Sequence, residues 1–208
     1  MSAADITDAR IDDVLAVWFG PPDEAPAARQ RRWFVADPAF DDELRRRFVD
    51  VIGAAGRGEL SDWQATARGS LALVIVLDQL SRNVFRGTAL AFSQDASALA
   101  VARASVAAGQ DRELTYGERA ILLMPFMHAE DRDTQRESVA AFEALHAEAV
   151  AAAAPAGEVA ALAGAADFAR RHAAVIERFG RYPHRNAMLE RTSTGDEAEY
   201  LSQPGAGF

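Results

Sequence analysis

The residues best suited to binding chemistry lie close together in the C-terminal part of the sequence. The nine residues 178–186, RFGRYPHRN, contain three arginines, a histidine and an asparagine. Arginine makes planar, bidentate hydrogen bonds to carboxylate and phosphate groups, and histidine changes its charge near neutral pH. We therefore expect this segment to bind an anionic group. Its candidate ligand-binding residues are Arg178, Arg181, Arg185 and Asn186, and its candidate proton-transfer residue is His184.

The same segment has a structural alternative. Arg178 and Arg181 lie where a long amphipathic helix is expected to end, and cations interact favourably with the C-terminal end of a helix dipole. In this alternative the arginines form a polar cluster that holds the C-terminal loop to the rest of the protein, and Asn186 bonds to the backbone.

A second polar segment, MPFMHAEDRDTQ, places His128, Glu130 and Asp131 just after Pro125. A histidine beside carboxylates can act as a general acid or base that the carboxylates orient. His128 is therefore the other candidate catalytic residue, and the two acids are candidate binding residues. Alternatively, the two acids only favour the positive N-terminal end of the next helix.

A third segment, LDQLSRNVFRG, contributes Arg82, Asn83 and Arg86 as candidate ligand-binding residues. Asp78 and Arg82 are spaced i, i+4 on the same stripe as apolar residues, so we expect both charges to face inward. Charges inside a protein need partners. The alternatives are a structural Asp78–Arg82 ion pair, or arginines that reach into a pocket at the end of the helix.

The remaining histidines carry weaker signals. His172 shares a helix face with apolar residues, which is more typical of a hydrogen-bonded core residue than of a catalyst. A metal bound by His128, His172 and His184 is disfavoured, because the sequence has no paired ligand spacing such as HExxH and the nearby arginines repel cations. The sequence therefore predicts no metal site and no cofactor.

The hydrophobic periodicity of almost every segment predicts α-helix. The apolar run Leu71–Leu80 is compatible with a buried strand, but its neighbours offer no partner strands, so we expect a central buried helix. Pro125 should kink or end its helix at once, because proline lacks a backbone donor. The expected helices cover residues 11–19, 37–52, 71–83, 93–108, 115–124, 133–153 and 158–179, with a short one beginning at 194.

Composition limits the possible partners. The 208 residues suit one domain, 1–208, with a flexible tail from about residue 202. A net charge of −9 argues against nucleic acid and anionic membrane as partners. The sequence has no cysteine, so disulfides and thiolate chemistry are excluded. The first residues, MSAADITDARIDD, lack the features of a signal peptide, so we expect a cytoplasmic protein.

Several motifs resemble one bacterial family. The segments LDQLSRNVFRGTALAFSQD, LLMPFMHAEDRDTQ and HAAVIERFGRYPHRNAMLERTSTGDEAEYL, with VWFG and DPAFDDELRRRF before them, are similar to the family known as domain of unknown function 924. The resemblance covers almost the whole chain. It implies an all-α, tetratricopeptide-like array of antiparallel helices, although no 34-residue repeat is readable here. It implies no established activity.

Two functions from different classes compete. In the first, the arginines and histidines of all three segments converge on one pocket for a small anionic molecule, with possible acid–base catalysis. In the second, the helical array binds a protein or peptide, and the polar motifs only lock the helices together. The sequence favours the first, because the unusual polar residues lie at helix ends and breaks and are not spread along helix faces.

Overall fold

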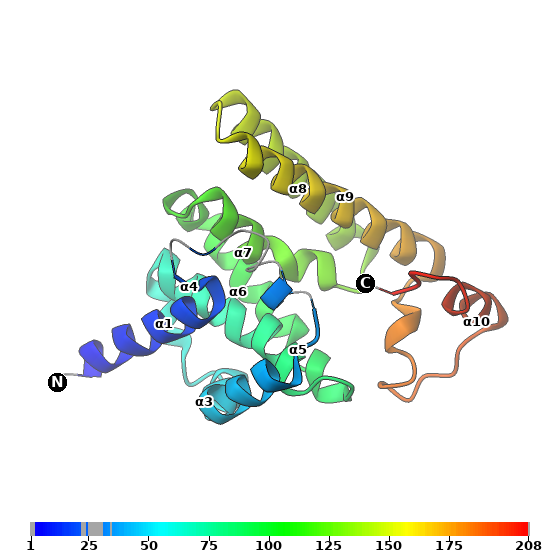
Figure 1. Ribbon diagram of the computed structural model, residues 1–208, viewed down its shortest axis with the longest axis horizontal. Helices are drawn as coiled ribbons and strands as arrows, with labels where there is room; N and C mark the ends of the chain where they lie inside the picture. The colour runs from blue at the N-terminus through cyan, green and yellow to red at the C-terminus, as the bar shows by residue number, and fades with distance from the viewer. Residues whose placement is uncertain (1–2, 22–23, 25–30, 34, 208) are drawn as a thin grey trace. The chain divides into compact units, whose positions relative to one another are not determined.

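The computed structural model describes residues 3–21, 24, 31–33 and 35–207, and these contain helices and no β-strand (Figure 1). The prediction of an all-α protein is confirmed. The contacts of the chain divide into two compact units, Met1–Arg86 with Leu90–Leu114, and Gly87–Ala89 with Thr115–Phe208. The finer expectations of one domain, a tetratricopeptide-like stack and a flexible tail stay predictions.

The first unit is built around one buried helix. That helix runs without interruption through α4 (Ala67–Val74), the π-helical segment η2 (Ile75–Leu80) and α5 (Ser81–Val84). It contacts the three longer helices of the unit, which supply large core side chains such as Trp18 and Phe48. Those helices are α1 (Ala3–Phe19), α3 (Pro38–Gly56) and α6 (Asp95–Ala107). Short 3₁₀ turns connect the elements: η1 (Ser61–Ala65), η3 (Ala89–Phe92) and η4 (Gln110–Glu113).

The central helix confirms the choice of helix over strand for the apolar run Leu71–Leu80, in which every residue is buried. Its π-helical turn was not predicted. A π-turn adds one residue to the usual helical turn, and hydrophobic periodicity does not reveal it in a segment that is apolar on all sides. Asp78 lies in this turn with a fully buried side chain.

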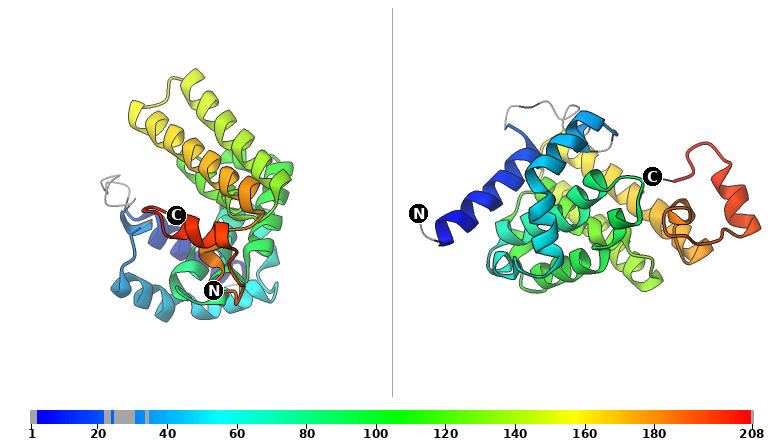
Figure 2. Two further views of the ribbon diagram at one scale, coloured as in Figure 1. Left: turned by 90° about the vertical axis from the view of Figure 1, so that its right-hand side faces the viewer. Right: turned by 90° about the horizontal axis from the view of Figure 1, so that it is seen from below.

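The second unit contains three long helices, α7 (Tyr116–His128), α8 (Arg132–Ala151) and α9 (Ala156–Phe179), each of which contacts the other two. The helices α8 and α9 lie side by side as an antiparallel hairpin in both views of Figure 2. A 3₁₀ turn, η5 (Pro183–Arg185), and a short helix, α10 (Gly195–Leu201), complete the unit.

Local sequence signals place most helix ends. Asp37 caps α3 in front of Pro38, and the Thr115–Glu118 and Thr194–Glu197 pairs form capping boxes at the starts of α7 and α10. Gly180 ends α9 with a φ of 70°, a left-handed conformation that glycine adopts without strain.

Pro125 was expected to kink or end its helix at once, and the expectation that the helix ends there is wrong. The helix α7 continues through Pro125 and ends at His128, three residues later. Proline removes only its own backbone donor, so the turn that follows can remain helical when other groups satisfy the terminal carbonyls. Gln135 supplies such a group, because its side-chain nitrogen lies 2.8 Å from the Met127 carbonyl oxygen and 2.7 Å from that of Ala129.

Gly69 permits a close approach at the start of the central helix, and this yields a stability prediction. An ideal Cβ at this position would lie 2.0 Å from the backbone carbonyl oxygen of Trp63, which is far inside van der Waals contact. We expect Gly69→Ala to lower the free energy of unfolding by about 2 kcal/mol, the typical effect of overpacking a core. Denaturant unfolding measures the change.

Gly164→Ala in α9 is the matched control for this prediction. A Cβ at Gly164 would meet nothing within 4 Å, so alanine should stabilise the helix by about 0.5–1 kcal/mol. Equal effects of the two substitutions would show that the contact between Gly69 and Trp63 does not constrain the fold.

Candidate functional site

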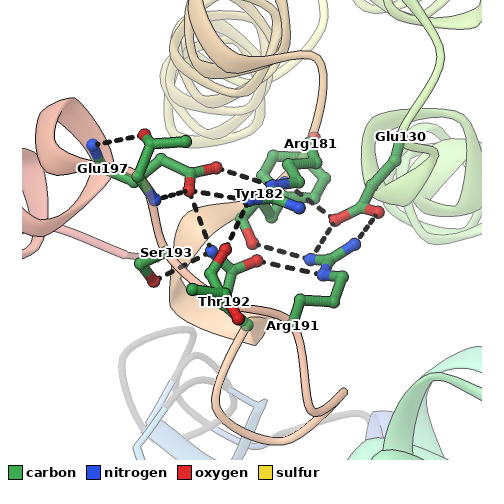
Figure 3. Close-up of polar contacts among 9 residues, drawn as sticks. Glu130, Arg181, Tyr182, Arg191, Thr192, Ser193 and Glu197 are labelled. Atoms are coloured by element: carbon green, nitrogen blue, oxygen red, sulfur yellow. Dashed lines mark hydrogen bonds and ion pairs between the residues drawn. The ribbon is translucent and has the colours of Figure 1, made fainter.

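The chain between α9 and α10 is irregular, and polar contacts hold it in place (Figure 3). It turns at Gly180, forms the single 3₁₀ turn η5 and then loops back to α10. Because this segment has few backbone hydrogen bonds of its own, its side chains determine its path. It contains most of the residues that the sequence singled out.

Glu130, in the connection between α7 and α8, anchors one side of this segment. Its two carboxylate oxygens accept hydrogen bonds from Arg191 at 2.6 and 2.9 Å, and one of them also accepts from the backbone N–H of Tyr182 at 2.7 Å. Burial alone would raise the pKa of Glu130, but these hydrogen bonds outweigh burial and hold the pKa below its usual range. Glu130 therefore fastens the segment to the helical body of the second unit.

Glu197, in the first turn of α10, anchors the other side. It receives a bidentate pair from Arg181 at 2.6 and 2.8 Å, and its backbone and side chain complete the capping box with Thr194. Asn186 donates to the same carboxylate at 3.3 Å. The Arg181 hydrogen bonds are the main reason that the pKa of Glu197 is lowered to about 2.

We call Glu130, Arg181, Asn186, Arg191 and Glu197 the C-terminal clasp. Arg191 joins its two sides, because its Nε donates to the Asn186 side-chain oxygen at 2.9 Å while its other nitrogens bind Glu130. In the clasp, Arg181 and Asn186 hold the C-terminal segment in place, as the structural alternative expected. Asn186 does so through hydrogen bonds to side chains, whereas that alternative expected hydrogen bonds to the backbone.

Sequence reasoning did not find Arg191 or the second role of Glu197. Arg191 lies five residues beyond the RFGRYPHRN segment, and Glu197 carries only a capping signal. An isolated arginine followed by an acidic capping residue does not reveal that each will pair with a residue far away in the sequence. The pairing depends on the turn at Gly180, which brings the segment back along itself.

Next to the clasp, two imidazole rings and one guanidinium lie against the ring of Tyr182, and a third imidazole lies next to one of the first two. The centroids of His172 and His184 each lie 5.6 Å from that of Tyr182, and His128 lies 6.2 Å from His172. The Arg185 guanidinium lies over the Tyr182 ring at 4.5 Å. We call these five residues, His128, His172, Tyr182, His184 and Arg185, the histidine cluster.

The cluster is fastened to the end of α7. The Tyr182 hydroxyl donates to the Met127 carbonyl at 2.6 Å and accepts from the Gln135 amide at 2.9 Å, and Arg185 donates to the carbonyl of His128 at 3.1 Å. Tyr182 is fully buried and Arg185 is nearly so, whereas His128 and His184 are partly exposed. Only the two partly exposed histidines can thus meet a ligand from solution without rearrangement.

His172 confirms the interpretation as a hydrogen-bonded core residue. Its Nδ1 lies 2.8 Å from the backbone carbonyl of Phe168, which can only accept, so Nδ1 carries the proton. The pKa of His172 is lowered to about 3, mainly by burial and then by the neighbouring His128 ring. The ring is therefore neutral throughout the physiological range.

Two further predicted residues have local roles. Asp131 is the N-cap of α8 and accepts from the backbone N–H of Thr134 at 2.8 Å, as the helix-start alternative expected. Glu130 does not share that role, because it binds Arg191 and Tyr182 instead. Arg178 lies over the ring of Phe179 at 4.6 Å, outside both the clasp and the histidine cluster.

The candidates of the first unit bind carboxylates within that unit. Arg82 pairs with the buried Asp78 at 3.2 Å, as the structural alternative expected, and also with Asp95 at 3.0 Å. Asn83 donates to Asp41 at 2.9 Å. Arg86 binds the same carboxylate at 2.7 Å and helps to hold its pKa below the usual range. The convergence of these residues with those of the second unit stays a prediction.

Within the ranges that the structure describes, no group of three or more His, Cys, Asp or Glu residues is arranged to hold a metal ion. None of the helices in the described part of the chain is both long enough and apolar enough to cross a membrane.

Comparison with known proteins points to relatives without an assigned activity. A family model described as a bacterial protein of unknown function, DUF924, matches residues 14–205. The solved structure of a protein of unknown function from Agrobacterium tumefaciens is similar, with 34% sequence identity and a TM-score of 0.78. The match covers 94% of this chain and 98% of that one. Comparison with curated proteins gives no significant match.

The clasp predicts a pH-dependent contribution to stability. Because the pKa of Glu197 falls from 4.5 to about 2 on folding, the unfolded chain binds more protons between these values. The contribution is complete above about pH 5 and is lost as the pH falls toward 2. We expect Glu197→Gln to lower the free energy of unfolding at pH 7 by about 2 kcal/mol, the typical loss for charged hydrogen bonds.

Urea unfolding of both proteins from pH 7 to pH 2 measures this difference, which should shrink as the medium becomes acidic. The matched control is Glu199→Gln, an exposed carboxylate of the same helix, which should change stability little at any pH. A difference between wild type and Glu197→Gln that does not vary with pH would contradict this account.

The buried imidazole gives a spectroscopic prediction. Because the pKa of His172 is about 3, its ring resonances should keep a constant chemical shift between pH 8 and pH 5. Proton NMR follows the ring signals, and the variant His172→Gln identifies the resonance by its disappearance. A titration of this resonance with a midpoint near 6.5 would mean that the ring is neither buried nor opposed by its neighbours.

Proposed function

The chain belongs to the DUF924 family of bacterial proteins of unknown function, and for this member we propose that the histidine cluster binds a small molecule carrying a phosphate or carboxylate group. The observation that carries the proposal is that two imidazoles and one guanidinium lie against the ring of Tyr182, with a third imidazole, that of His128, next to His172. These groups are donors or cations, and both phosphate and carboxylate recognise them.

The local electrostatics support an anionic ligand. Burial is the main cause of the lowered pKa of His172, and interactions with His128, Arg185 and His184 lower that pKa further. Arg185 also lowers the pKa of Glu130, as Arg191 does. Burial disfavours a charge of either sign, but the interactions with Arg185 and the neighbouring imidazoles favour a negative charge at this place.

The residues of the histidine cluster have different roles in the proposed site. His128 and His184 contact the ligand, because they are the imidazoles that reach the surface. Arg185 is a buried charge held over Tyr182, so it orients the site and attracts the anion. His172 stays neutral and positions its neighbours. If the ligand is also transformed, His128 and His184 are the residues that move a proton.

A thermal-shift measurement tests the proposal. Inorganic phosphate, pyrophosphate, succinate and citrate are added to the purified protein, with sodium chloride at matched ionic strength as the reference. A ligand present at 100 times its Kd stabilises the folded state by about 2.7 kcal/mol. For a chain of this length that corresponds to a rise of about 5 °C or more in Tm. We expect at least one of the four anions to produce such a rise.

Two variants and one control locate the binding site. His128→Gln and His184→Gln should each remove most of the rise, because they delete the proposed contacts and keep the side-chain volume similar. His146→Gln changes the one histidine outside the cluster and should leave the rise intact. The absence of a rise with all four anions, or a rise that both cluster variants retain, would refute the proposal and favour the peptide-binding alternative.

A further inference from the structure

The chain that follows α10 turns back toward η5 (Figure 1). The backbone N–H of Ala206 donates to the Gln203 carbonyl at 3.1 Å, which closes a turn of four residues. Pro204 and Gly205 occupy the two central positions of this turn, and Gly205 has a φ of 78°. A proline followed by a glycine with positive φ is the pattern of a type II turn. The direction of the segment is therefore set by its own sequence.

The turn brings Gly207 against His184, one of the two histidines that are proposed to contact the anion. An ideal Cβ at Gly207 would lie 3.3 Å from the His184 Cβ and 3.9 Å from its Nδ1. This Nδ1 atom is buried, although the His184 side chain as a whole is partly exposed. Glycine suits the contact, because a side chain would crowd His184 and because Gly207 has a φ of 93°. Backbone atoms thus lie against one edge of the imidazole.

The segment of residues 203–207 is held more weakly than the clasp. The hydrogen bonds that shape it run from the backbone N–H of Ala206 to Gln203 and from that of Gln203 to Tyr200, so they join it to itself and to α10. Its residues carry no charge, and most of them are exposed. Segments with few buried contacts open locally at little cost in free energy. The segment can therefore leave His184 while the clasp keeps α10 in place.

We propose that residues 203–207 are a strap that closes over the Nδ1 edge of His184 and that an anion displaces when it binds there. The proposal rests on the anion site proposed above and adds its regulation. In the closed state an anion meets only the open part of the ring. When the strap leaves, a protonated Nδ1 becomes available to donate a hydrogen bond to a phosphate or carboxylate. The strap and the anion then compete for the same edge of the ring.

This competition weakens binding without changing the contacts of the bound state. If the strap is closed in about four molecules out of five, the apparent Kd of the anion is about five times that of a permanently open site. By the same linkage, an anion that binds only the open state shifts the strap toward that state. The strap therefore sets the anion concentration at which the site fills.

An NMR titration with inorganic phosphate, and a second one with succinate, measures this effect. The full-length protein is compared with a variant that ends at Ser202, which keeps α10 and the Glu197 side of the clasp. We expect the shortened protein to bind at least one of the two anions with a Kd about fivefold lower. Circular dichroism and Tm confirm that the shortened protein is folded.

Gly207→Ala tests the strap without a deletion. Alanine at this position would crowd His184 and would have to adopt a positive φ, so it should push the strap away and lower the Kd in the same direction. Gly109→Ala is the matched control, because Gly109 has a φ of 73° in the first unit and a Cβ there would meet nothing within 4 Å. The control should leave the Kd unchanged.

The contact between the strap and the ring has a signal that needs no ligand. The α-protons of Gly207 and the β-protons of His184 should give a nuclear Overhauser effect in the free full-length protein, because the two residues are in direct contact. We expect this signal to weaken as phosphate or succinate is added, in step with the occupancy of the site.

The possible failures are distinguishable. The absence of the Gly207–His184 signal in the free protein would show that the segment does not cover the ring. A Kd that is equal in the two proteins would refute the strap alone, and a weaker affinity of the shortened protein would mean that the segment is part of the binding site. Binding of neither anion by either protein would contradict the anion site itself, and the regulatory role of the strap would fail with it.

Discussion

The order of the C-terminal segment depends on two glutamates that are each bound by an arginine. Glu130 and Glu197 belong to different helical regions of the second unit, and both bind the irregular chain between α9 and α10. A carboxylate that leaves water must receive hydrogen bonds or a cation. Here these donors all come from one segment, so satisfying the two carboxylates also fixes the path of that segment. Tyr182 and its neighbouring histidines occupy their positions as a consequence.

The same constraint operates in the first unit. Asp78 lies within a helix that is buried on all sides, and Asp41 lies where α3 meets the end of that helix. Asp78 is paired with Arg82, one turn further along the same helix. Asp41 accepts hydrogen bonds from Asn83 in the last turn of that helix and from Arg86 just beyond its end. Buried ion pairs add little net stability compared with apolar packing, but they penalise any register that separates the charges. In a uniformly apolar helix, such pairs are a means of selecting a single arrangement.

The features that were predictable from the sequence are those that depend on neighbouring residues. The helix ends at Asp37, Thr115, Thr194 and Gly180 depend on only a few residues, and these helices begin or end within one residue of the expected positions. The prediction that the helix ends at Pro125 was wrong because the end of that helix is stabilised by Gln135, whose contribution depends on how α8 packs. The ion pairs of the clasp could not be predicted for the same reason. Local patterns identified the arginine-rich segment but not its partners, because partners distant in the sequence are chosen by the fold.

The position of Glu197 after its partners Arg181 and Asn186 in the sequence has a consequence for biosynthesis. The ribosome completes α7, α8 and α9 before it adds either Arg191 or Glu197, so a nascent chain can pack these helices early. Arg181 and Asn186, by contrast, must wait for a partner that is translated later than they are. The segment that carries His184 therefore takes its final conformation only after Glu197 has been added.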